Sequence, residues 1–181
     1  MVGETILDTK LIEGIVIDKD VLHPSMSRKI ENPRILILEG GLEYKKGESQ
    51  TMIELTNNKN FNAFLASEEQ DILDKIDRIV SLKPDIVLTD KGLSELASYQ
   101  LMNNKITAFR RCKKTDLARL SLASGAKIVS VNEAFSDSAV GTRCKLYETR
   151  KIGKEYYSYF EQCEQPKACT IVVFFFGFLA I

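Results

Sequence analysis

The stretch that decides the fold is residues 84–131, which read PDIVLTDKGLSELASYQLMNNKITAFRRCKKTDLARLSLASGAKIVSV. Three short apolar runs in it have the length and polar borders of buried strands, namely Ile86–Leu88, Ile106–Phe109 and Ile128–Val131. The residues between these runs predict helices near Leu93–Met102 and at Asp116–Ser124, where Gly125 supplies a C-terminal cap. This alternation is typical of an α/β domain in which neighbouring strands run parallel.

Upstream of that stretch, the β-branched runs Ile15–Ile17 and Ile35–Leu38, with Ile12 just before them, also have the pattern of buried strands. We expect these strands to pair with one another in a sheet. Between Phe61 and Val80, apolar residues recur at helical spacing and acidic residues fill the other faces. This pattern predicts one long amphipathic helix or two short ones.

Downstream, the chain changes character from Lys145 to Gln162, where tyrosine-rich segments flank Gly153 as expected of a β-hairpin in a separate β layer. The polar stretch Lys45–Asn60 is where we expect any flexible element. Residues 174–181 form an atypical apolar tail rich in phenylalanine, too short for a spanning helix, which needs about 20 apolar residues. We interpret this tail as a fragment or chain end outside a single domain at 1–173.

Composition excludes several classes of function. A length of 181 residues suits one compact domain, and 25 basic residues balance 25 acidic ones, so no net field draws the chain to nucleic acid or to a membrane surface. The four cysteines contain no C-x-x-C pair and the single histidine is distant from them in sequence, so the chain lacks the spacing of a zinc site. The start of the chain does not resemble a secretory leader, and we expect reduced thiols and a cytoplasmic location.

Catalytic patterns are weak in this chain. Gly41 and Gly47 have the wrong spacing for a phosphate-binding loop, and Glu48 stands where such a loop requires lysine. Any serine or cysteine nucleophile would depend on His23, which precedes Pro24 and fits a turn better than an active site. Nucleophilic catalysis is therefore disfavoured.

Two other chemical interpretations stay open. The acidic residues Glu68, Glu69, Asp71 and Asp74 could hold a divalent metal, although on a helix they more simply form a solvated face. A small cytosolic α/β enzyme could use Asp90, Lys91 and Asp116 near predicted strand ends, where such folds bind ligands.

The predicted helix Asp116–Ser124 carries two apolar sectors. At 100° per residue, Leu117, Leu120 and Ala123 share one face, while Ala118 and Leu122 lie on another beside Arg119 and Ser121. If the first face packs on the core, the second presents a mixed surface able to contact varied apolar segments without a fixed pocket. The alternative is a helix buried on two sides.

Several segments recur in the order and spacing of one known family. They are His23–Met26, Asn32–Leu36, Leu42–Thr51, Lys91–Ala97, Arg110–Arg111, Lys113–Asp116 and Ser124–Val129. Together they resemble the apical domain of group II chaperonin subunits, the TRiC (CCT) family of the eukaryotic cytosol, over roughly residues 3–172. Within that family, Lys151–Gly153 and Cys163–Ile171 most resemble gamma-type subunits.

The resemblance implies a layered β/β/α fold with a helical protrusion at about 53–76 that serves as a lid segment. It implies binding of unfolded proteins of the actin and tubulin class, and assembly with sister subunits in a hetero-oligomeric double ring. The family hydrolyses ATP, with magnesium, in an equatorial domain of which we find no counterpart here. We therefore expect no cofactor and no enzymatic activity in this chain itself; a third possibility is a fragment that is inert outside its ring.

The resemblance also implies site residues. On the helix Asp116–Ser124 the expected client-binding residues are Ala118, Arg119, Ser121 and Leu122. The loop Tyr44–Thr51 is expected to add Tyr44, Lys45, Lys46 and Glu48. In the protrusion, Phe61, Phe64, Leu65 and Glu68 are expected near neighbouring subunits or substrate, with simple core packing as the alternative.

Overall fold

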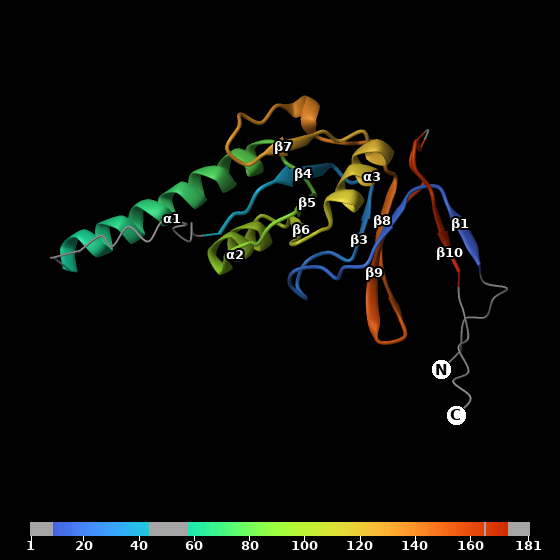
Figure 1. Ribbon diagram of the computed structural model, residues 1–181, viewed down its shortest axis with the longest axis horizontal. Helices are drawn as coiled ribbons and strands as arrows, with labels where there is room; N and C mark the ends of the chain where they lie inside the picture. The colour runs from blue at the N-terminus through green and yellow to red at the C-terminus, as the bar shows by residue number, and fades with distance from the viewer. Residues whose placement is uncertain (1–8, 44–57, 165, 174–181) are drawn as a thin grey trace.

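The computed structural model describes residues 9–43, 58–164 and 166–173, and only the helical backbone of residues 58–66. Its strands and helices follow the order β1 (Lys10–Ile12), β2 (Ile15–Ile17), β3 (Lys29–Glu31), β4 (Ile35–Glu39), α1 (Asn58–Ser81), β5 (Ile86–Thr89), α2 (Glu95–Asn103), β6 (Thr107–Phe109), α3 (Lys114–Ser124), β7 (Ile128–Ser130), β8 (Leu146–Ile152), β9 (Glu155–Glu161) and β10 (Thr170–Val172). A short 3-10 helix, Asp137–Ala139, lies between β7 and β8. Figure 1 shows these elements arranged in layers.

The central layer is a parallel sheet with the strand order β6-β5-β4-β7. In β4, Ile35 lies opposite Ile86 of β5, and Ile37 lies opposite Ile128 of β7. The apolar residues 35–38 and 86–88 are fully buried. Strands that are apolar on both faces need cover on both faces, which crossover helices supply in parallel sheets. The α/β layer with parallel neighbours that the sequence predicts is confirmed.

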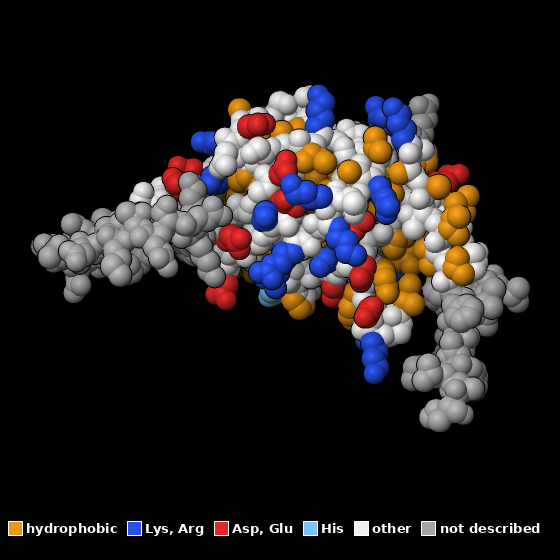
Figure 2. Space-filling model, viewed as in Figure 1, with side chains coloured by type: hydrophobic (Ala, Val, Ile, Leu, Met, Phe, Trp, Pro, Cys, Tyr) orange, Lys and Arg blue, Asp and Glu red, His pale blue; other side chains and the backbone are white. Residues whose placement is uncertain are grey.

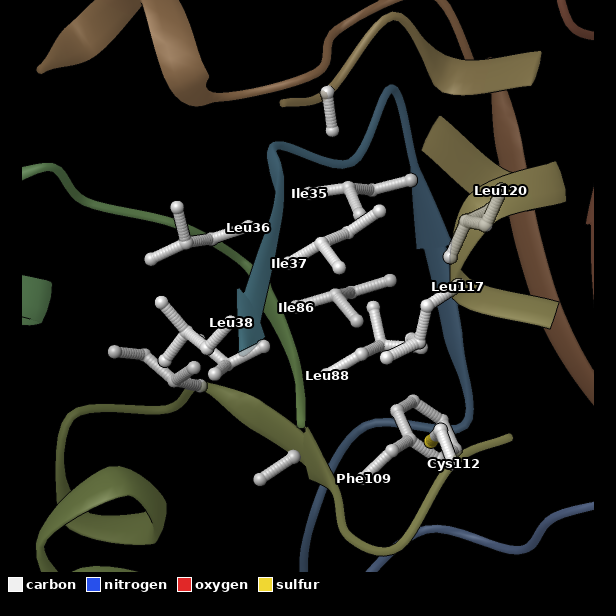
Figure 3. Packing of buried hydrophobic residues seen from close by; sticks show 14 of the residues in the cluster. Ile35, Leu36, Ile37, Leu38, Ile86, Leu88, Phe109, Cys112, Leu117 and Leu120 are labelled. Carbon is white, nitrogen blue, oxygen red and sulfur yellow. The ribbon is translucent and has the colours of Figure 1, made fainter. Parts of the chain in front are cut away.

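The helices cover both faces of this sheet. Because parallel crossovers are right-handed, the two steps β4-α1-β5 and β5-α2-β6 place α1 and α2 on one face, where they contact each other. The step from β6 back to β7 runs the other way and places α3 on the opposite face. Figure 3 shows Ile35, Ile37, Ile86 and Leu88 pointing toward Leu117 and Leu120 of α3, while Leu36 and Leu38 point away toward the other face.

A second sheet is antiparallel, with the order β2-β9-β8-β3. Its centre is the hairpin β8–β9, paired from Leu146 opposite Glu161 to Ile152 opposite Glu155. Gly153 closes the hairpin with a φ of 62°, a conformation that glycine adopts without a Cβ penalty. The predicted hairpin and separate β layer are confirmed.

The two sheets meet through aromatic side chains. Phe109 at the end of β6 packs edge-on against Tyr147 of β8, with ring centroids 5.9 Å apart, and against Phe160 of β9 at 6.4 Å. All three rings are almost completely buried. On the same side of the parallel sheet, α3 contacts β2. The helix α3 and this aromatic contact therefore join the parallel and antiparallel layers into one core.

One expectation about strand pairing is wrong. The runs around Ile12, Ile15–Ile17 and Ile35–Leu38 form β1, β2 and β4 as strands, but each belongs to a different sheet. β1 pairs with β10, and β2 pairs with β9. The reason is local: a turn at Gly14 ends β1, and β4 is apolar on both faces, so it needs parallel neighbours on either side.

The helix α1 is a single helix of 24 residues, which corresponds to about 36 Å. Its C-terminal half packs on the sheet through Ile72, Ile76 and Ile79, and Figure 1 shows its N-terminal half extending away from the sheets.

Within the predicted protrusion at about 53–76, residues 53–57 lie outside the described residues. The tail 174–181 also lies outside them. In the described part of the chain, no helix combines the length and apolar character needed to cross a bilayer.

Candidate functional site

The helix α3 owes its position to a glycine cap at its C-terminal end and to one apolar face. Asp116 lies in its first turn, and Gly125 ends it in a left-handed conformation with a φ of 74°. The inner face packs on the parallel sheet through Leu117, Leu120 and Ala123, which are 2% exposed or less. The sector of this helix predicted to face the core is therefore confirmed.

The outer face of α3 is open to solvent. Ala118, Arg119 and Leu122 are exposed, and Leu122 keeps 51% of its accessible surface, so the alternative of a helix buried on two sides is wrong for this chain. Arg119 lies 3.8 Å from the carboxylate of Asp116, an exposed pair that constrains it little. The result is a mixed surface of apolar and cationic groups.

Ser121 differs from the other predicted residues of this face. It is half-buried, and its hydroxyl donates a hydrogen bond of 2.6 Å to the Ala126 carbonyl beyond the helix cap. A hydroxyl used in this way secures the turn after the helix and has little freedom to engage a ligand. The structure thus brings Ala118, Arg119 and Leu122 together at the surface and gives Ser121 a supporting contact.

The remaining predicted site residues do not join this face. Tyr44, Lys45, Lys46 and Glu48 lie outside the described residues. The predicted apolar tip of the protrusion, Phe61, Phe64 and Leu65, lies on the α1 backbone, and its side chains are not described. Glu68 is half-buried on α1, which covers the face of the sheet opposite α3.

The structure adds a groove that the sequence analysis missed. It has a volume of about 680 Å³ and lies between α2 and the segment that precedes β3. Its lining includes Leu22, His23, Leu93, Leu96, Tyr99, Met102 and Arg110. The segment is held along the edge strand β6 by the amide of Leu22, which donates to the Ala108 carbonyl at 3.0 Å. From the sequence, His23 was considered only as a turn residue or catalytic base and as part of the family signature His23–Met26, because nothing local shows that this segment meets α2.

Ion pairs occupy part of the carboxyl edge of the parallel sheet, where an enzyme of this topology would bind its ligand. Lys114 lies 2.6 Å from Glu39 and 3.8 Å from Asp90, and the hydrogen bond to Glu39 raises the pKa of Lys114. The carboxylate of Asp90 also accepts from the Gly40 amide at 2.8 Å. The cavity among these groups has a volume of about 70 Å³, too small for a substrate. Asp116 pairs with Arg119 and Lys91 is exposed, and neither of them lines the cavity beside Asp90.

The residues considered for nucleophilic catalysis and for metal binding have structural roles instead. The ring nitrogen Nδ1 of His23 accepts a hydrogen bond from the Ser25 amide at 3.2 Å, as expected of a histidine in a turn. Asp74 accepts from the Gln70 side chain at 2.9 Å on the outer surface of α1. Over the described ranges, no three histidine, cysteine or acidic side chains lie close enough to hold a metal ion.

Comparison with known proteins agrees with the layered fold. The solved open-state monomer of a group II chaperonin from Methanococcoides burtonii superposes with a TM-score of 0.72 and 28% identity, over 94% of this chain and 36% of that one. The fold is therefore that of part of a group II chaperonin subunit. A family model described as the TCP-1/cpn60 chaperonin family matches residues 1–174, and the chain belongs to that family.

Individual relatives are gamma subunits of the T-complex protein 1. The subunit from Thalassiosira weissflogii is 48% identical over 171 residues, which are 94% of this chain and 31% of the relative. The subunit from Dictyostelium discoideum is 47% identical, over 94% of this chain and 32% of the relative. The human subunit is 48% identical, over 94% of this chain and 31% of the relative. The chain thus spans about a third of the length of the curated relatives it matches.

Proposed function

We propose that this chain is the apical, client-recognition domain of a cytoplasmic TRiC-type chaperonin subunit, and that it binds unfolded proteins. The observation that carries the proposal is the outer face of α3, where Ala118 and Leu122 stay exposed beside Arg119 while the inner face of the same helix is fully buried. A helix that keeps apolar side chains in water offers contact to chains that have not yet buried their own.

The strength of such contact is modest. Covering a leucine completely is worth about 1.5–3 kcal/mol, so the half-exposed side chain of Leu122 offers about 1 kcal/mol when a client covers it. Weak contact of this kind favours many sequences and releases them readily. Several subunits acting on one client would raise the overall affinity through effective concentration.

The proposal extends to the assembly. By membership of the family, we propose sister subunits in a hetero-oligomeric double ring as partners, and clients of the actin and tubulin class. We assign the projecting half of α1 to the lid segment, with Phe61, Phe64 and Leu65 on it. We place ATP and magnesium in a separate equatorial part of such a subunit, so that this domain binds clients without a cofactor.

The test is capture of chemically denatured actin by the chain and by the double variant Ala118→Glu and Leu122→Glu. We expect the variant to bind at least fivefold more weakly, because a client that covers this face would have to bury two carboxylates. The matched control is Ile171→Glu with Val173→Glu, which places the same two charges on apolar side chains that are 65% and 61% exposed at β10. Circular dichroism checks that all variants fold.

Equal binding by the chain and the double variant would remove α3 from the client site. Loss of binding in the control with Ile171→Glu and Val173→Glu as well would show capture by general surface hydrophobicity. Absence of binding in every form would favour a domain that is inert outside its ring.

A further inference from the structure

Two buried cysteines face each other at the open end of the β8–β9 hairpin. Beyond the last pair of the ladder, Gln162 turns the chain with a φ of 56°, and the amide of Glu164 then donates to the Arg143 carbonyl at 2.8 Å. Cys144 follows Arg143, and Cys163 precedes Glu164. This hydrogen bond therefore holds the two cysteines at facing positions on adjacent segments.

The spacing of these segments suits a covalent bond between the two side chains. Facing residues of antiparallel strands have Cα atoms about 4.5–5.5 Å apart, and a disulfide joins residues whose Cα atoms are about 4.4–6.8 Å apart. The Sγ atom of Cys144 lies 3.3 Å from the Leu146 carbonyl oxygen and 3.4 Å from that of Glu161. The Sγ atom of Cys163 lies 3.8 Å from the Phe160 carbonyl oxygen. Both sulfur atoms thus lie against the end of one ladder.

The two thiols differ in acidity as well as in burial. Cys144 is 0% exposed and Cys163 is 5% exposed. A hydrogen bond between the two thiols raises the pKa of Cys144 and lowers the pKa of Cys163. Because the thiolate is the form that attacks a disulfide, Cys163 is suited to be the attacking sulfur and Cys144 the resolving thiol. Burial raises the pKa of Cys112 to about 12, which makes that thiol a poor nucleophile.

The residues that flank the two cysteines carry an excess of one positive charge. Arg143 and Lys145 flank Cys144, and Glu164, which pairs with Lys145 at 3.2 Å, follows the other cysteine. Figure 2 shows Lys and Arg side chains around the place where α3 lies in Figure 1, and the last residue of α3, Ser124, accepts a hydrogen bond of 3.1 Å from the Arg143 amide. Cations of this kind attract an anionic reagent. Oxidised glutathione is a small anionic disulfide.

We propose that Cys144 and Cys163 form a redox modification site, which a small anionic disulfide of the glutathione class converts into an intramolecular disulfide. The Cys163 thiolate attacks one sulfur of the small disulfide, whose other sulfur leaves as a thiolate, and a mixed disulfide forms. Cys144 then gives its proton to solvent and attacks the Cys163 sulfur, which releases the second small thiolate. The chain loses two electrons and two protons, and the small disulfide becomes two thiols. This reaction does not depend on the proposed client binding.

The new bond would connect two places on which the packing depends. Cys163 follows β9, which contributes Phe160 to the aromatic contact between the sheets. Arg143, the neighbour of Cys144, holds the end of α3 through the Ser124 carbonyl. The bond would also close a loop that contains the whole hairpin, which restricts the unfolded chain. We therefore expect the oxidised chain to melt about 5 °C or more above the reduced chain.

The test uses the full chain with Cys169→Ser, which removes the exposed thiol as a competing site. The reduced protein is kept for about a day at pH 8 with about 1 mM each of reduced and oxidised glutathione, because buried thiols exchange through local opening. N-ethylmaleimide in denaturant then counts the free thiols by mass, and digestion identifies linked peptides. We expect the count to fall from three adducts to one, with Cys144 linked to Cys163. Thermal unfolding compares the oxidised and reduced forms.

Two further substitutions in the same background locate the bond. Cys144→Ser should give no internal linkage and no rise in melting temperature. The matched control is Cys112→Ser, which removes another buried thiol and should leave the linkage intact. The peptide map of the Cys169→Ser chain tests the site even if Cys144→Ser does not fold.

Four results would overturn the proposal. The first is three free thiols after equilibration, with the fold intact by circular dichroism. The second is linkage of Cys163 to Cys169, in place of Cys144, when the unmodified chain is treated in the same way. The third is loss of the linkage in the Cys112→Ser control, which would mean that the thiols pair only in an opened chain. The fourth is a linked chain that melts below the reduced one, because a bond formed at preset positions should not strain the fold.

Discussion

At the residue scale, the four cysteines show how burial separates chemically identical groups. Burial raises the pKa of Cys112 to about 12. The adjacent Cys163 thiol, together with burial, raises the pKa of Cys144, and the same contact lowers the pKa of Cys163, whose side chain is 5% exposed. Cys169 is exposed. Because only a thiolate that a reagent can reach reacts, these environments predict one reactive cysteine.

We therefore predict that iodoacetamide at pH 8 labels only Cys169 in the folded chain. With a pKa of about 12, roughly one Cys112 in ten thousand is a thiolate at that pH, and lack of access protects Cys144 and Cys163. Intact mass should show a single adduct in buffer and four adducts in strong denaturant. The Cys169→Ser variant should show no adduct in buffer. Rapid labelling of any other cysteine in this variant would contradict the burial described above.

At the element scale, the turn at Gly14 separates strands that the sequence alone predicts to pair. Its φ is 153°, and a Cβ at this position would overlap the Phe160 carbonyl of β9. Its own carbonyl accepts a hydrogen bond from the Thr170 hydroxyl at 3.2 Å. Only glycine lets the chain leave β1 and enter β2 so close to the neighbouring backbone. Because of this turn, β1 pairs with β10 and β2 pairs with β9.

A pair of glycine substitutions tests this role. We expect Gly14→Ala to lower the free energy of unfolding by about 3 kcal/mol or more, because the methyl group meets fixed backbone. Gly153→Ala is the matched control: its φ of 62° is also unfavourable for alanine, but no atom lies within 4 Å of the added carbon. It should cost about 1 kcal/mol. Urea unfolding compares the two, and equal costs would mean that backbone strain alone, without the close contact, governs Gly14.

The sequence predicted helices and strands correctly where the spacing of apolar residues alone identifies the element. The helices α1, α2 and α3, the strands β4, β5, β6 and β7 and the hairpin β8–β9 all lie where apolar spacing and the glycine caps place them. The exposed face of α3 was also predictable, because Ala118 and Leu122 fall outside the sector that contains Leu117 and Leu120. Pairing failed because short strands carry no mark of their partner, and partners here lie up to about 160 positions away.

At the scale of the whole molecule, the contact between the two sheets is aromatic. Phe109 comes from the edge strand of the parallel sheet, and Tyr147 and Phe160 come from the antiparallel hairpin, with their own centroids 5.2 Å apart. Only 1% of the Phe109 side chain is exposed. The layers that present α3 and the groove along α2 therefore depend on a few rings at their junction.

We predict that Phe109→Ala lowers the free energy of unfolding by about 3–5 kcal/mol, the usual cost of removing a buried phenylalanine. The control is Tyr99→Ala, an aromatic side chain that is 58% exposed beside the groove and should change stability by about 0.5 kcal/mol or less. Urea unfolding followed by far-ultraviolet circular dichroism measures both. A small cost for Phe109→Ala would show that the sheets pack independently of this ring.

The sequence by itself determined the class of fold, the helical apolar stripe between Phe61 and Val80, the family signatures and the helix that carries Ala118 and Leu122 outside its buried face, because periodicity and caps act over a few residues. Tertiary structure alone decided which strands share a sheet and where α2 meets the segment around Leu22. It also brought Lys19 beside Arg110 and Arg111, from positions about 90 residues apart. These contacts between distant residues arise because whole layers pack around one core. No local sequence pattern encodes that packing.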